Sequence, residues 1–168
     1  MKNSLVRVST NYGDFTIELN AKQAPKTVAN FLQYVSDGHY NGTIFHRVIS
    51  NFMIQGGGFL PEMKEKPTRD PIDNEASAKL KNEMYTVAMA RTTEPHSATS
   101  QFFINVQDNA FLDFKSATAQ GWGYCVFGKV IEGESVIDDI KMQPTTRFGF
   151  HQDVPKRDIV IKSIEAIS

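Results

Sequence analysis

Short runs in which apolar and polar residues alternate make up most of this sequence. Alternation with a period of two places every second side chain on one face of a β-strand. The runs at residues 5–10 and 15–19 flank a turn at Gly13, so they predict an antiparallel hairpin. Further strands are predicted at residues 43–49, 52–55, 86–90, 102–106, 124–130 and 158–167.

Two segments follow the helical period instead. Apolar residues recur at helical spacing from Val28 to Val35, with Pro25 near the start and Gly38 just beyond the end. A second helix is predicted around residues 135–141, which carry a short apolar stripe. Two helices among roughly eight short strands predict a mainly β fold, with a closed or nearly closed antiparallel sheet and helices packed on its ends.

Length and charge narrow the class of protein. The 168 residues suit one domain spanning residues 1–168, and 40% hydrophobic with 22% charged residues is ordinary for a globular chain. Lys+Arg 18 against Asp+Glu 19 leave a net charge of -1, so no nucleic-acid or membrane partner is expected.

The first ten residues do not form a secretory signal, and no apolar run approaches the ~20 residues of a membrane helix. The single cysteine, Cys125, fits a reducing compartment, and we expect the cytoplasm.

Most residue types that could carry chemistry lack the required spacing. Gly56-Gly57-Gly58 has neither phosphate-loop spacing nor a following helix, so close backbone approach or a bulge is the better interpretation. Cys125 lies in an apolar run that favours a buried role over a nucleophilic one. No metal site or cofactor is therefore expected. Structural or surface roles are predicted for all the histidines: His39, His46, His96 and His151.

Arg47 is the unusual residue, because it places a guanidinium in a β-rich, otherwise apolar stretch. If residues 43–49 form a strand, Phe45, Arg47 and Ile49 share one face. The pattern leaves two interpretations open: Arg47 points to solvent, or it lines an aromatic cleft. The phenylalanines of residues 101–104 and 111–112 fit a Phe-lined pocket, although core packing explains them equally well.

Several motifs together resemble the cyclophilin family of peptidyl-prolyl cis-trans isomerases, from the first hairpin to the last strand. That resemblance implies a closed eight-stranded antiparallel barrel capped by two α-helices. Residues 120–124 and 151–155 look like the bacterial cytoplasmic members of the family. The motifs are Phe45-His46-Arg47 through Gly57, Met89-Ala90, Ser100-Gln101-Phe102-Phe103-Ile104 and Val126-Phe127-Gly128-Lys129-Val130.

The resemblance also implies the site residues. By motif, the catalytic residues are Arg47 and Gln55. The substrate-binding residues are Phe52, Met53, Ala90, Arg91, Gln101, Phe103, Phe111, Leu112 and Tyr124. Within the family, the counterparts of Phe52, Met53, Phe103 and Leu112 receive the proline ring. Gln55 and the backbones of Ala90 and Arg91 correspond to groups that hold the peptide main chain, and Gln101 sits beside the groove.

Three of these positions depart from the eukaryotic family pattern. Phe111 stands in place of a tryptophan, so an indole N–H that the family uses to bind cyclosporin is absent, and we expect weak cyclosporin binding. Tyr124 replaces a histidine and lacks the imidazole that titrates near neutral pH. Arg91 replaces an asparagine, and its side chain is expected to favour acidic residues upstream of the proline.

The implied activity is isomerisation of X-Pro bonds in proline-containing peptides and in unfolded or flexible protein segments, which assists folding. It needs no covalent intermediate, metal or cofactor, and we expect a monomer. A second interpretation is a proline-peptide-binding or chaperone module in which catalysis is incidental. A metal-dependent or nucleophilic hydrolase is a weak third, because the sequence shows no ligand set or activated nucleophile.

Overall fold

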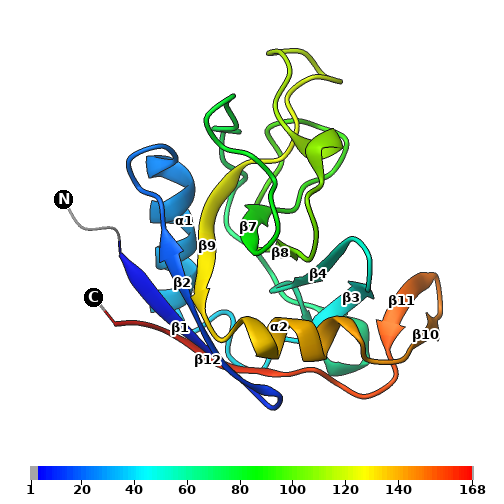
Figure 1. Ribbon diagram of the computed structural model, residues 1–168. Helices are drawn as coiled ribbons and strands as arrows, with labels where there is room; N and C mark the ends of the chain where they lie inside the picture. The colour runs from blue at the N-terminus through cyan, green and yellow to red at the C-terminus, as the bar shows by residue number, and fades with distance from the viewer. Residues whose placement is uncertain (1–3, 168) are drawn as a thin grey trace.

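A strongly curled antiparallel sheet of eight strands forms the body of the molecule in the computed structural model, which describes residues 4–167 (Figure 1). The sheet order is β12-β1-β2-β9-β7-β8-β4-β3. The strands are β1 (Leu5–Thr10), β2 (Gly13–Leu19), β3 (Phe45–Ile49), β4 (Met53–Gly56), β7 (Thr86–Met89), β8 (Phe102–Asn105), β9 (Val126–Glu132) and β12 (Ile161–Ala166). All eight predicted strands are therefore confirmed, with boundary changes of a few residues.

The prediction of a closed barrel is wrong in one respect, because the sheet is an open, strongly curled half-barrel. Regular pairing ends at β3 on one side and β12 on the other. An isolated bridge between Ile44 and Val160 joins the two edges, supported by a hydrogen bond from the Phe45 N–H to the Ile159 carbonyl. The reason is that the C-terminal segment is hydrogen-bonded at both edges of the sheet. Its residues up to 161 bond to the segment that leads into β3, and its residues from 161 onward pair with β1.

Both predicted helices are present. Helix α1 (Pro25–Ser36) begins with proline in its first turn, where the missing N–H costs nothing, and α2 (Glu134–Lys141) follows β9. Phe31 of α1 lies edge-on to Phe102 of β8, with the ring centroids 5.7 Å apart. The two helices cover different parts of the curled sheet (Figure 1). Among residues 4–167, no helix is long and apolar enough to cross a membrane.

Two small hairpins occupy segments for which the sequence pattern predicts no strand. The first pairs β5 (Phe59–Leu60) with β6 (Lys64–Glu65) around a 3-10 turn at Pro61–Met63. The second pairs β10 (Thr145–Phe148) with β11 (His151–Pro155). Most of β10 and the start of β11 are exposed, so these strands carry no apolar alternation that the sequence could reveal.

Candidate active site

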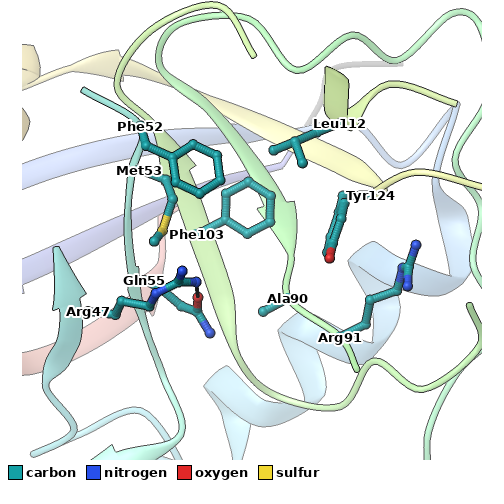
Figure 2. A pocket seen from close by; sticks show the side chains of 9 residues that line it. All are labelled: Arg47, Phe52, Met53, Gln55, Ala90, Arg91, Phe103, Leu112 and Tyr124. Carbon is teal, nitrogen blue, oxygen red and sulfur yellow. Dashed lines mark hydrogen bonds between the residues drawn. The ribbon is translucent and has the colours of Figure 1, made fainter. Parts of the chain in front are cut away.

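Arg47 belongs to a row of paired residues that crosses three strands. Arg47 of β3 pairs with Gln55 of β4, and Gln55 pairs with Phe103 of β8. Directly paired residues of neighbouring antiparallel strands project from the same face of a sheet. The cation, the amide and the phenyl ring therefore gather on one face, as Figure 2 shows.

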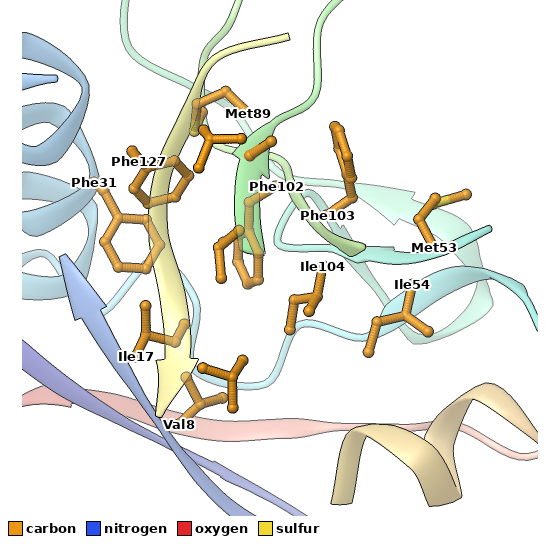
Figure 3. Packing of buried hydrophobic residues seen from close by; sticks show 14 of the residues in the cluster. Val8, Ile17, Phe31, Met53, Ile54, Met89, Phe102, Phe103, Ile104 and Phe127 are labelled. Carbon is orange, nitrogen blue, oxygen red and sulfur yellow. The ribbon is translucent and has the colours of Figure 1, made fainter. Parts of the chain in front are cut away.

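The opposite face of these strands supplies the core. Figure 3 shows Phe102, Ile104 and Ile54 pointing one way and Phe103 and Met53 the other. Side chains along a strand alternate between the two faces of the sheet, and Phe102 and Ile104 on the core face are completely buried. Consecutive residues of β8 and β4 thus divide between the core and the candidate site.

A β-bulge at His46 corrects the expectation that Phe45 and Arg47 share a face. Phe45 pairs with Gly56 and Arg47 with Gln55, so three residues of β3 lie opposite two of β4. The extra residue turns Phe45 into the core, where it is fully buried, and leaves Arg47 exposed on the other face. Phe45 is therefore a core residue.

A cavity of about 140 Å³ opens beside this row. Its apolar side includes Met53, Phe103 and Leu112, which are 1%, 4% and 8% exposed, so the walls are preformed. A cavity of ~150 Å³ with apolar walls holds a benzene molecule, so this one accommodates a single small ring. The lining side chains, all within the set that the resemblance implied, are Arg47, Phe52, Met53, Gln55, Ala90, Arg91, Phe103, Leu112 and Tyr124 (Figure 2).

Three hydrogen-bonded side chains form a chain that starts at the polar side of the cavity and ends in the neighbouring groove. Arg47 Nη1 donates to Gln55 Oε1 across 3.5 Å, and Gln55 Nε2 donates to Gln101 Oε1 across 2.9 Å. The first bond is long, so the guanidinium keeps donors available for another acceptor. Arg47 is exposed, yet it lies at the cavity wall rather than away from it.

Arg91 lies at the far end of the cavity from Arg47 (Figure 2). Its Nε and Nη2 donate to the Gly123 carbonyl at 3.1 and 2.9 Å, and its Nη1 donates to the Thr92 carbonyl at 2.8 Å. The guanidinium carbon also lies 4.4 Å from the centroid of the Tyr124 ring. Arg91 is thus held in place with part of its donor set still unused.

Two of the expected site residues lie outside the cavity itself. Gln101 lines a neighbouring polar groove together with Gln55, and Gly58 makes room for it, because a Cβ there would lie 2.5 Å from Gln101 Cγ. This close approach confirms the interpretation of the triple glycine. Phe111 is 64% exposed and packs against Phe52, with ring centroids 5.6 Å apart, so it supports the rim rather than the floor.

Sequence reasoning missed a buried asparagine network behind the cavity. Asn82, Asn105 and Asn109 are almost completely buried and bonded in series, with Asn105 Nδ2 donating to Asn82 Oδ1 and Asn109 Nδ2 to Asn105 Oδ1. Asn109 Nδ2 also donates to the Phe52 carbonyl at 2.9 Å. Asn82 Nδ2 donates to the carbonyls of Leu112 and Tyr124.

This network ties together the backbones of three cavity residues: Phe52 in the turn between β3 and β4, and Leu112 and Tyr124 in the connection between β8 and β9. A row of asparagines at unrelated sequence positions carries no period, so nothing in the sequence pattern indicates that they meet. That these asparagines lie together behind the cavity can be seen only once the fold is known.

His46 and Cys125 have perturbed protonation for reasons of burial. Desolvation lowers the pKa of the His46 imidazole to about 4, and the nearby His151 and Arg47 add to the effect. Desolvation also raises the pKa of the Cys125 thiol to about 11, which agrees with the predicted buried, unreactive role. No cluster of three or more His, Cys, Asp or Glu side chains that could hold a metal occurs within residues 4–167.

The arrangement defines a class of site: two guanidinium groups and a pair of bonded amides around a preformed cavity with an apolar side, which admits one small ring. The model of the family described as "cyclophilin type peptidyl-prolyl cis-trans isomerase/CLD" matches residues 5–166. The chain belongs to this family, and it is a peptidyl-prolyl cis-trans isomerase.

Relatives match along nearly the whole chain. Peptidyl-prolyl cis-trans isomerase cyp18 of Streptomyces antibioticus is 59% identical, over 98% of this chain and 99% of its own length. Peptidyl-prolyl cis-trans isomerase B of Escherichia coli is 58% identical, over 95% of this chain and 98% of its own length. A crystal structure of a cyclophilin type isomerase from Cryptosporidium parvum, in the presence of the dipeptide Ala-Pro, has a TM-score of 0.83 at 33% identity. It covers 98% of this chain and 99% of that chain.

Proposed function

We propose that the cavity receives the proline ring of an X-Pro peptide and that Arg47 stabilises the twisted transition state of the bond. The observation that carries the proposal is the position of the Arg47 guanidinium at the wall of a small apolar cavity, with Gln55 beside it. The Ala-Pro dipeptide present in the Cryptosporidium parvum crystal structure supports a proline peptide as the ligand. The whole chain would act as one catalytic unit.

The reaction is slow without a catalyst because of amide resonance. Partial double-bond character gives the C–N bond a rotation barrier of ~18–20 kcal/mol, so free X-Pro bonds exchange over roughly 10–100 s. At the transition state the amide is twisted and the proline nitrogen regains a lone pair. The carbonyl oxygen then carries less charge than in the planar form. An enzyme accelerates rotation by interacting more strongly with this twisted form.

Arg47 supplies an interaction that the planar form cannot accept. A guanidinium N–H can donate to the proline nitrogen only after that nitrogen has regained its lone pair. The long bond to Gln55 leaves such a donor available, and the Gln55–Gln101 hydrogen bond restrains the amide that orients it. The interaction is therefore specific to the transition state.

The apolar cavity contributes by anchoring the ring while the preceding residue rotates. Phe52, Phe103 and Leu112 form walls that hold the ring, and a low-polarity setting disfavours the more polar planar amide. Gln55 and the backbones of Ala90 and Arg91 would hold the main chain on the polar side.

The free energy of a hydrogen bond indicates how much of the acceleration Arg47 supplies and how much is left to the cavity. A hydrogen bond to a charged group contributes ~1.5–3 kcal/mol, and ~1.36 kcal/mol corresponds to a tenfold change in rate. Arg47 therefore accounts for about one to two decades of rate. The remaining acceleration comes from anchoring and positioning.

Natural substrates would be proline-containing peptides and unfolded or flexible protein segments, on which isomerisation assists folding. Arg91, held against Tyr124 with unused donors, would favour acidic residues upstream of the proline. A monomer suffices, because one chain provides all nine side chains that line the cavity. We place this activity in the cytoplasm, where the buried Cys125 stays reduced.

Cyclosporin should inhibit this protein only weakly. Phe111 presents a hydrocarbon ring on the rim and has no N–H to donate. Titration of the isomerase activity with cyclosporin checks this, and Phe111→Trp should tighten inhibition. Low-nanomolar inhibition of the unaltered protein would contradict the expectation.

An isomerisation assay on short X-Pro peptides tests the proposal. The unaltered protein should accelerate exchange, and Arg47→Ala should lower kcat/KM by about tenfold to a hundredfold. Arg7→Ala, which removes an exposed arginine from β1, is the matched control and should leave the rate unchanged. Near-normal turnover by Arg47→Ala would favour the binding-module alternative, in which catalysis is incidental.

A further inference from the structure

The hairpin β10–β11 presents two phenylalanines to solvent beside the candidate site. Phe148 is 47% exposed and Phe150 is 98% exposed, the largest exposed fraction among the exposed large apolar side chains of residues 4–167. Gly149 between them adopts φ +61°, which suits glycine in a tight turn, and Arg147 Nε donates to the Gly149 carbonyl at 3.1 Å. We call Phe148, Gly149 and Phe150 the aromatic tip.

The aromatic tip borders a second cavity, of about 290 Å³. Strand β11 packs beside β3, which brings the tip next to the strand that carries Arg47 (Figure 1). Phe59 packs against two of the residues that line this cavity, because its ring lies 4.5 Å from that of His46 and 5.6 Å from that of His151. The lining residues are His46, Arg47, Phe150, His151, Gln152 and Asp153.

Arg47 lines both cavities, so the two cavities are neighbours on either side of this residue. Figure 2 places Arg47 at one end of the first cavity and Ala90 with Arg91 at the other. A peptide with its proline in this cavity would therefore extend past Ala90 and Arg91 in one direction and past Arg47 in the other. Arg91 is assigned to residues upstream of the proline. The segment that passes Arg47 is then the one that follows the proline.

We propose that the second cavity and the aromatic tip form a subsite for an apolar, preferably aromatic, side chain located after the proline of the substrate. The inference rests on the proposed function and names a preference of the same site. Phe150 keeps nearly its whole ring in water, so covering it removes apolar surface from solvent, and a substrate ring gains aromatic pairing as well. Gln152 and Asp153 supply polar groups at the rim for the substrate main chain.

A single exposed apolar side chain on a protein surface is common and needs no explanation. Here two rings lie two residues apart on an ordered turn, and the cavity beside them shares Arg47 with the candidate active site. That adjacency favours a substrate segment over an unrelated partner.

The experiment compares X-Pro peptides of one length that differ only in carrying Phe or Ser at each of the first four positions after the proline. Isomerisation is measured by NMR exchange for the unaltered protein, Phe150→Ser and Met84→Ser. Met84 is the matched control, because its side chain is 39% exposed and lines neither cavity.

The unaltered protein should prefer Phe over Ser at one or two of these positions by about threefold to tenfold in kcat/KM. Phe150→Ser should remove that preference through KM while leaving the rates on the Ser peptides unchanged, and Met84→Ser should retain it. The subsite is contradicted by equal rates for Phe and Ser at all four positions, or by a preference that survives Phe150→Ser. Failure to accelerate any peptide would instead contradict the proposed function.

Discussion

Gln55 is the residue through which the Arg47 guanidinium is oriented. Gln55 Oε1 accepts from Arg47, and the Gln55 amide is itself restrained by Gln101 Oε1 at 2.9 Å. The Gln55 amide thus sets the direction of the Arg47 guanidinium. The 3.5 Å bond between them is long, so the guanidinium keeps unused donors. A substitution at Gln55 should therefore affect catalysis without touching the apolar cavity walls.

Gln55→Leu should lower kcat/KM for X-Pro peptides by roughly threefold to tenfold, because the guanidinium loses its acceptor and samples more orientations. Gln33→Leu on the exposed surface of α1 is the control, since its amide bonds only to Asp37 among residues 4–167. The two variants are compared with the unaltered protein in the same exchange assay. Equal activity for all three proteins would remove Gln55 from its orienting role.

At the scale of elements, the buried asparagines hold separate loops at the cavity. Asn109 joins the turn that carries Phe52 to β8, and Asn82 joins the carbonyls of Leu112 and Tyr124. Buried amides of this kind are costly when left unpaired, so the loops are constrained to one arrangement. The cavity walls are thus positioned by side chains that do not touch the cavity.

Asn109→Ala should lower the free energy of unfolding by about 1–3 kcal/mol and also reduce the activity of the molecules that remain folded. Thr43→Ala is the control, because the buried Thr43 hydroxyl donates to the Tyr40 carbonyl at 2.6 Å and belongs to no cavity wall. Urea unfolding gives the stability of each variant, and exchange kinetics in buffer give the activity. Full activity in folded Asn109→Ala would show that the network acts only on stability.

Strand alternation predicted the elements well but not how each face is used. The runs in β8 and β4 gave the correct strands because one face of each packs in the core. The bulge at His46 could not be predicted, since it depends on the register between β3 and β4 rather than on either strand alone. Yet the bulge decides that Arg47 faces the cavity while Phe45 faces the core.

For the molecule as a whole, the sequence motifs predicted the family and the cavity residues, but the period of the sequence predicted neither the open edges of the sheet nor the hairpin β10–β11. Closure depends on where the C-terminal segment leaves one edge and joins the other at Ile161. The strands of the hairpin are largely exposed, so no apolar period marks them. Long-range pairing and exposed strands are the two features that a local pattern cannot encode.

Stability of the whole molecule should fall in mild acid because of His46. Its pKa is about 4 in the folded protein against 6.5 when unfolded, so between these values the unfolded chain binds more protons. The contribution of neutral His46 to the free energy of unfolding is therefore complete above pH 6.5. It is lost as the pH falls towards 4, by a total on the order of 3 kcal/mol. Burial also lowers the pKa of His39, which adds a loss of the same sign.

Urea unfolding at pH 7 and pH 4.5 measures this loss. His46→Gln should show a smaller decrease between the two pH values than the unaltered protein, whereas His96→Gln, at an exposed position, should show the full decrease. The comparison uses the difference between pH values, so any constant effect of a substitution cancels. An identical decrease in His46→Gln would contradict the assignment.

Arg47 should act on the twisted bond rather than on substrate binding. NMR exchange on one X-Pro peptide, measured for the unaltered protein and Arg47→Ala, separates the rotation rate of the bound peptide from its Kd. In Arg47→Ala, we expect rotation of the bound peptide to slow by about tenfold to a hundredfold, while Kd changes by less than about threefold. A variant that rotates the bound peptide at the normal rate, with all of the loss in Kd, would contradict it.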